Sequence, residues 1–60
     1  MDLKYDTPVD VSKKQYDVCM RLHSGVCAGR TENGKYYIKV LLMKYVKEVE
    51  RDLIKINNNG

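Results

Sequence analysis

The stretch that most constrains the fold of this chain is residues 39–56, KVLLMKYVKEVERDLIKI, because it holds the longest unbroken helical period in the sequence. Apolar residues recur there at spacings of three and four, which at about 100° per residue places them on one stripe of a helix. The stripe comprises Leu42, Val46, Val49, Leu53 and Ile56, with Tyr45 beside it. We expect a long C-terminal helix over residues 41–56, packed on the core through this stripe, and a frayed tail over residues 57–60.

Two capping signals predict another helix directly after Ser12. Ser12 and Gln15 form a capping box, in which each side chain accepts a hydrogen bond from the backbone of the other residue. Val11 and Tyr16 flank this box as a hydrophobic staple, which fixes the angle at which the chain enters the helix. These signals place the first helix over residues 13–24.

Gly25 marks the end of this first helix, and an N-terminal arm precedes it. Gly25 suits the left-handed position that commonly follows the last helical residue. Residues 1–11 precede the helix as an arm, in which Val9 and Val11 form either an edge strand or an extended lead-in. Pro8 excludes a central strand there, because proline cannot donate a backbone hydrogen bond to a neighbour.

Between the two helices the sequence predicts a β-hairpin over residues 26–40. Asn33 and Gly34 are favoured at the centre of a type I′ turn, and this turn places Arg30 opposite Tyr37. The alternative is that Asn33 caps the last helix, which then begins at Gly34. With the hairpin, the chain is a single small α+β domain made of an N-terminal arm, a helix, a β-hairpin and a long C-terminal helix.

Cys19, His23 and Cys27 form the pattern C-x3-H-x3-C, which invites comparison with a zinc site. A structural zinc site needs four ligands, and the chain offers no further Cys or His. We therefore expect no metal and no cofactor, with two core thiols and a half-buried imidazole instead. A thiol nucleophile would need an orienting third group and a water-excluding pocket, for which 60 residues leave little volume, so we expect no enzyme.

The N-terminus lacks the apolar segment of a signal peptide, and no apolar run has the length of a membrane span. These features favour a cytoplasmic protein without a membrane partner. In a reducing compartment free thiols are expected at Cys19 and Cys27. The absence of targeting signals also fits a phage or mobile-element product.

The positive charge of the chain is concentrated in its middle, where residues 12–47 carry a net charge of +6 against −2 for residues 1–11 and −1 for residues 48–60. Basic side chains beside a tyrosine favour a nucleic-acid partner, since cations contact phosphates and aromatic rings stack on bases. The candidate contacts are Arg30, Lys35, Tyr37 and Lys39 on the hairpin, and Lys13, Lys14 and Arg21 on the first helix.

A protein partner is the alternative, with the chain acting as an inhibitor or as a subunit of a larger assembly. A chain of this length buries only about 60 % of the surface that its unfolded form exposes, and its apolar content exceeds what such a core can hold. The candidate interface residues are Met43, Ile54 and Leu22. A homodimer through the last helix would cover the same surface.

The order of helix, hairpin and helix resembles that of small winged-helix regulators and excisionases of mobile elements. Those proteins place a helix-turn-helix before the wing. Residues 24–26 leave no room for a recognition helix, so we assign none of their functional residues to this chain.

Overall fold

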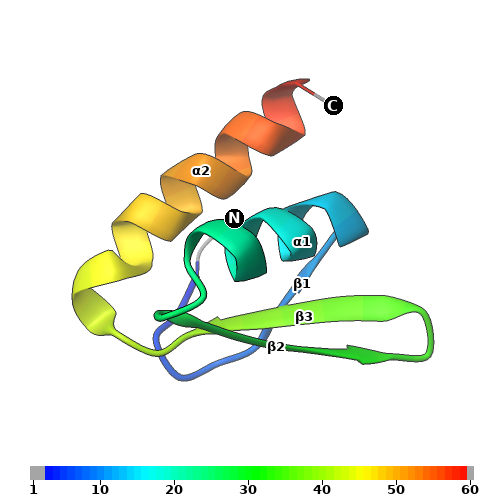
Figure 1. Cartoon of the computed structure of the whole chain (residues 1–60), viewed down its shortest axis with the longest axis horizontal. Helices are drawn as coiled ribbons and strands as arrows, with labels where there is room; N and C mark the ends of the chain where they lie inside the picture. The colour runs from blue at the N-terminus through cyan, green and yellow to red at the C-terminus, as the bar shows by residue number, and fades with distance from the viewer. Residues whose placement is uncertain (1–2, 60) are drawn as a thin grey trace.

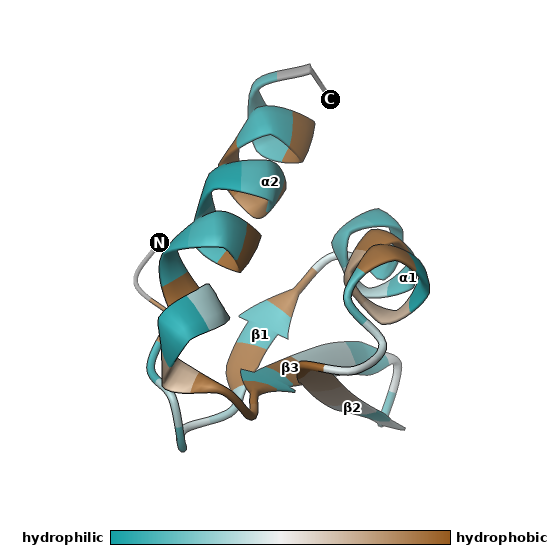
Figure 2. Ribbon diagram, turned by 60° about the vertical axis from the view of Figure 1, so that its left-hand side comes forward, coloured by the Kyte–Doolittle hydropathy of each residue, from teal (hydrophilic) through white to brown (hydrophobic). Residues whose placement is uncertain are grey.

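The structure, a computed structural model, describes residues 3–59 and confirms the small α+β domain. In chain order the elements are β1 (Val9–Val11), α1 (Lys13–Leu22), β2 (Cys27–Glu32), β3 (Lys35–Val40), the 3₁₀ turn η1 (Met43–Tyr45) and α2 (Val46–Asn59). Both helices lie on the same side of a three-stranded sheet (Figures 1 and 2). Residues 1, 2 and 60 of the predicted arm and tail lie outside the described residues.

The β-hairpin formed by β2 and β3 has the predicted turn and the predicted register. Asn33 and Gly34 both have positive φ angles, 50° and 79°, as a type I′ turn requires. Arg30 lies opposite Tyr37 in the antiparallel pair. The alternative in which the last helix begins at Gly34 is therefore wrong.

The N-terminal arm contributes an edge strand to the sheet. β1 pairs antiparallel with β3, so that Val9 lies opposite Ile38 and Val11 opposite Tyr36. The strand order is β1-β3-β2, which leaves β3 in the centre. Pro8 directly precedes β1, consistent with the restriction of proline to the edges of sheets.

The capping box starts α1 as the sequence predicts. The backbone N–H of Gln15 donates to Ser12 Oγ at 3.1 Å, and the backbone N–H of Ser12 donates to Gln15 Oε1 at 2.9 Å. Two helix-end donors are thereby satisfied within one turn.

The end of α1 differs from the prediction, because the helix stops at Leu22 with His23 as its C-terminal cap. The carbonyl of His23 accepts hydrogen bonds from the backbone N–H groups of both Val26 and Cys27, each at 2.8 Å. This tight turn leads directly into β2. Gly25 consequently does not adopt the left-handed conformation that the sequence suggested.

The start of the last helix is also displaced, from the predicted residue 41 to Val46. The backbone N–H of Leu41 donates to the carbonyl of Val26 at 2.6 Å, which keeps the chain extended beyond β3, and Met43–Tyr45 then form a 3₁₀ turn. Leu42 is consequently 44 % exposed. Its predicted place on the buried stripe of the last helix is wrong.

The core lies between the sheet and the two helices. Its buried apolar residues are Leu3, Cys19, Val26, Cys27, Ile38, Val40, Val49 and Leu53. Val49 and Leu53 supply the buried side of α2, as the helical period predicts, and Ile56 packs against them half-buried. α2 continues through Asn59, so the described part of the predicted tail is helical.

A disulfide joins Cys19 in α1 to Cys27 at the start of β2, so the expectation of free thiols is wrong. The turn at His23 reverses the chain and leaves the two Cα atoms 6.4 Å apart, within the range that a disulfide spans. Both cysteines are buried in the core.

Candidate functional site

The face of the sheet turned away from the helices is the candidate site, and we call it the outer sheet face. α1 covers the opposite face, because the ring of Tyr16 and the sulfur of Met20 lie against Gly29. Successive residues of a strand point to opposite faces, so the neighbours of Gly29 and Ile38 point away from the helices. The outer sheet face carries Asp10, Ala28, Arg30, Glu32, Lys35, Tyr37 and Lys39.

Tyr37 occupies the middle of the outer sheet face, because it lies on the central strand. It is paired with Asp10 of β1 on one side and with Arg30 of β2 on the other. The guanidinium carbon of Arg30 lies 5.2 Å from the centre of the Tyr37 ring, a cation–π arrangement. The half-buried ring is thereby held beside a cation.

A shallow hollow of about 150 Å³ lies beside Tyr37. It is lined by Pro8, Ala28, Gly29, Arg30, Tyr37, Ile38 and Lys39. Cavities that enclose a small-molecule ligand measure about 300–1,000 Å³. The outer sheet face is therefore suited to surface contact with part of a larger molecule.

The charge of the outer sheet face is mixed. Three of the predicted cations, Arg30, Lys35 and Lys39, share it with two carboxylates. Glu32 lies opposite Lys35 and places a carboxylate oxygen 3.8 Å from the Arg30 guanidinium. Asp10 adds the second negative charge at the edge strand. A phosphate backbone would meet a modest net positive charge here.

The predicted contacts on α1 do not join this face. Lys13, Lys14 and Arg21 belong to the helix layer, on the other side of the sheet (Figure 2). The ammonium of Lys13 donates to the carboxylate of Asp17 at 2.8 Å, and this hydrogen bond raises the pKa of Lys13. The structure thus separates the predicted basic residues into two groups.

The predicted protein-interface residues are exposed but come from three separate elements. Leu22 ends α1, Met43 lies in η1 and Ile54 lies on α2. Leu41 and Leu42 extend the exposed apolar surface directly before Met43.

Sequence reasoning missed a groove between the N-terminal segment and α2. It measures about 670 Å³ and is lined by Leu3, Lys4, Val46, Lys47, Glu50, Arg51, Ile54 and Lys55. The sequence assigned none of its cations, Lys4, Lys47, Arg51 and Lys55, to a candidate site. The signal that points to them is the spacing of four residues between Lys47, Arg51 and Lys55, which aligns them along α2.

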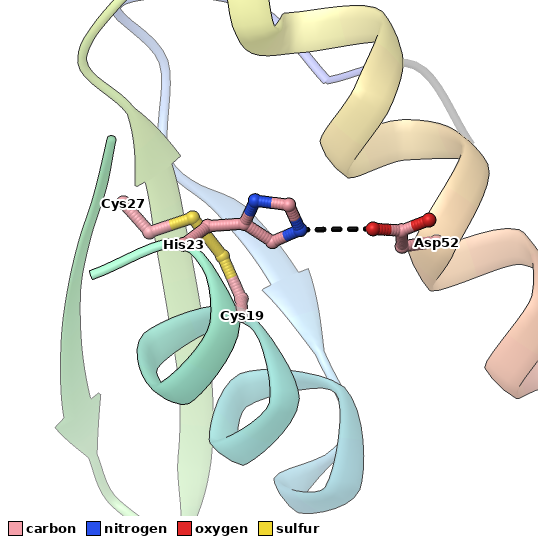
Figure 3. Close-up of a disulfide and its surroundings, with 4 residues drawn as sticks. All are labelled: Cys19, His23, Cys27 and Asp52. Atoms are coloured by element: carbon pink, nitrogen blue, oxygen red, sulfur yellow. Dashed lines mark hydrogen bonds and ion pairs between the residues drawn. A yellow bond between two sulfur atoms is a disulfide. The ribbon is translucent and has the colours of Figure 1, made fainter. Parts of the chain in front are cut away.

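The C-x3-H-x3-C motif is a disulfide with a histidine between its cysteines (Figure 3). His23 directs its Nε2 atom to Asp52 of α2 at 2.9 Å. In the disulfide, neither sulfur is a thiolate that could attack a substrate or bind zinc. Within residues 3–59 no three His, Cys, Asp or Glu side chains are grouped as metal ligands.

The chain matches no protein-family model, and comparisons with curated proteins and with solved structures found no similar protein. No helix in the described part of the chain has the length and apolarity to cross a membrane. The class that the fold defines is a small α+β domain with an open sheet face.

Proposed function

We propose that the protein is a non-enzymatic binding protein that holds single-stranded nucleic acid on its outer sheet face. The observation that carries this proposal is the position of Tyr37 on the central strand of a sheet face that the helices leave open. Unpaired bases stack on such rings, and each base stacked on an aromatic side chain contributes about 1–3 kcal/mol.

The cations around Tyr37 take the role of phosphate contacts. Arg30 lies opposite Tyr37 across the hairpin, and Lys35 and Lys39 lie two residues away along β3. Neutralising three phosphates of a single strand gives a slope of about −2 when log Kobs is plotted against log salt concentration. Since Asp10 and Glu32 oppose these cations, the stacking contribution decides whether binding is measurable.

The test is fluorescence anisotropy with labelled DNA and RNA strands of about 12 nucleotides, a length in the range of single-strand binding sites. Binding is titrated across about 50–200 mM salt. Tyr37→Leu is expected to weaken binding about 5- to 160-fold, the range that one stacked base implies. Tyr5→Leu is the control, because Tyr5 is an exposed tyrosine that lies outside the sheet.

Charge reversal provides the second arm of this experiment. The triple variant Arg30→Glu, Lys35→Glu and Lys39→Glu is expected to abolish binding and the salt slope with it. Circular dichroism establishes that each variant remains folded. Absence of binding by the wild-type protein at the lowest salt, or an equal loss in the Tyr5 variant, overturns the proposal.

The second candidate is a protein-interaction module, an inhibitor or a subunit of a larger assembly of phage or mobile-element origin. It is favoured by the consecutive residues Leu41, Leu42 and Met43, which are 40 %, 44 % and 66 % exposed. We assign this apolar run to contact with a second copy of the chain. Sedimentation equilibrium is expected to show concentration-dependent dimers that Met43→Ser weakens. A monomer at all concentrations contradicts the assignment of this apolar run to a second copy of the chain.

A cytoplasmic location remains part of the proposal, and it requires the fold to be stable without its disulfide. Disulfides are reduced in the cytoplasm of most cells. A cytoplasmic protein must therefore keep its structure without the bond between Cys19 and Cys27.

A further inference from the structure

The groove between the N-terminal segment and α2 has an apolar floor and a basic rim. Two rows of α2 side chains line it, each with a spacing of four residues. One row is Val46, Glu50 and Ile54, and the adjacent row is Lys47, Arg51 and Lys55. Four residues of an α-helix rise about 6 Å, so each row presents a side chain at about this interval.

The opposite wall is the N-terminal segment, which is tied to α2. The backbone N–H of Leu3 donates to Glu50 Oε2 at 3.2 Å. Leu3 itself is buried in the core, which anchors this wall. The bond also engages the only carboxylate among the described residues that line the groove.

The charge of the groove is strongly positive in comparison with the outer sheet face. Among the described residues that line it, Lys4, Lys47, Arg51 and Lys55 are basic and Glu50 is acidic. Arg51 approaches Asp52 at 3.4 Å but keeps most of its side chain in solvent. An anionic partner is therefore favoured by charge complementarity, which steers association and suppresses partners of the wrong sign.

We propose that this groove binds an acidic amphipathic helix of a partner protein. Carboxylates at every fourth position of such a helix repeat with the same pitch as the row Lys47, Arg51 and Lys55. Leucines on the adjacent row of the partner helix cover Val46 and Ile54. The side chains of the two helices then interdigitate, as in ordinary helix packing.

The apolar floor selects a peptide over a nucleic acid. Phosphates match the cations, but a sugar-phosphate backbone offers no aliphatic side chains for Val46 and Ile54. Burial of apolar area contributes roughly 25 cal/mol per Å², so the floor favours a partner with leucines. This inference is independent of the nucleic-acid proposal, because the groove and the outer sheet face share no residue.

The test uses a fluorescein-labelled synthetic peptide of about 16 residues, slightly over four helical turns, with Glu at every fourth position and Leu in the adjacent row. A second peptide carries the same residues in scrambled order. The wild-type protein is expected to bind the first peptide and to bind the scrambled peptide at least about tenfold more weakly, a difference of about 1.4 kcal/mol.

Two pairs of charge reversals locate the binding site. Lys47→Glu with Lys55→Glu is expected to weaken binding at least about tenfold. Lys14→Glu with Arg21→Glu changes the net charge equally on α1 and is expected to leave binding within about twofold. Ile54→Ser, at a partly exposed position, keeps the charge and is expected to weaken binding through the floor alone.

Three results overturn the proposal. The first is failure of the wild-type protein to bind the acidic peptide at millimolar concentration. The second is an equal effect of the two charge-reversal pairs. The third is displacement of the peptide by a DNA strand combined with no effect of Ile54→Ser, which identifies a polyanion site without apolar recognition. Thermal unfolding by circular dichroism verifies the fold of each variant.

Discussion

His23 Nε2 lies 2.9 Å from Asp52 Oδ2, and this contact joins the cap of α1 to α2 across 29 residues of sequence (Figure 3). The two side chains are mostly shielded from solvent, at 11 % and 23 % exposure. The hydrogen bond from His23 lowers the pKa of Asp52, and the nearby positive charge of Arg51 lowers it further. The stability that this contact between the two helices contributes therefore depends on pH.

Acidification is expected to weaken the wild-type protein through Asp52. A carboxyl whose pKa is lower in the folded than in the unfolded state stabilises the fold above its ordinary pKa of about 4. That contribution disappears as the pH falls through the folded-state value. Asp52→Asn removes it at every pH.

The measurement is the melting temperature of both proteins between about pH 6 and about pH 2, a range that spans the titration of Asp52. The wild-type melting temperature is expected to fall more steeply than that of Asp52→Asn below about pH 4. Parallel curves for the two proteins would show that the bond to His23 contributes no pH-dependent stability.

Reduction of the disulfide is expected to lower the free energy of unfolding by about 2 to 3 kcal/mol, the loop-entropy value for a closed loop of this size. Cys19 and Cys27 are separated by 8 positions. The measurement is urea unfolding of the protein with and without reductant, and of a variant in which both cysteines are serine. Identical unfolding midpoints with and without reductant contradict the expectation.

The same experiment decides whether a reducing compartment suits this chain. A reduced protein that still unfolds cooperatively is compatible with the cytoplasmic location. A reduced protein that is unfolded at about 25 °C requires an oxidising compartment.

Local signals in the sequence predict much of this fold. Two of these signals are the capping box of Ser12 and Gln15 and the turn at Asn33 and Gly34. Each depends only on residues close together in the sequence, so the sequence pattern is enough to predict the local backbone geometry. The helical period also identifies Val49 as buried. These features need no knowledge of distant parts of the chain.

Features that depend on distant contacts were missed. Leu42 fits the helical period, but the hydrogen bond between Leu41 and Val26 keeps the chain extended there, and Leu42 remains exposed. The disulfide depends on the turn at His23, which no local motif specifies. The groove requires Leu3 and α2 to meet across nearly the whole chain. At Leu42 tertiary structure overrides a local preference, whereas the disulfide and the groove depend on contacts that local patterns do not specify.

Gln15 connects the capping box to α2, and its side chain is predicted to stabilise the fold. Its side chain is buried, and Nε2 donates to the carbonyl of Leu53 at 3.2 Å. Gln15→Ala leaves a cap donor without its partner and is expected to destabilise the protein by about 1–3 kcal/mol. The measurement is the free energy of unfolding in urea.

Gln15→Glu is the informative comparison, because glutamate keeps the acceptor for the N–H of Ser12 but cannot donate to Leu53 while ionised. It is expected to destabilise the protein at neutral pH and to recover partly on mild acidification, when the carboxyl becomes protonated. If Gln15→Glu matches the wild type at neutral pH, the bond to Leu53 contributes little.

Gly29 is predicted to be intolerant of any side chain, although alanine is ordinarily the better residue in a strand interior. A Cβ atom there would lie 2.5 Å from the ring of Tyr16, whose centre is 5.3 Å from that of Tyr36. Gly29→Ala is expected to lower the free energy of unfolding by about 1–3 kcal/mol, the usual effect of overpacking.

Tyr16→Leu makes room for the methyl group of Gly29→Ala, so the double variant should lose less stability than the sum of the two single variants. Urea unfolding of the four proteins measures this coupling, and simple additivity would show that α1 does not pack on β2 through Gly29.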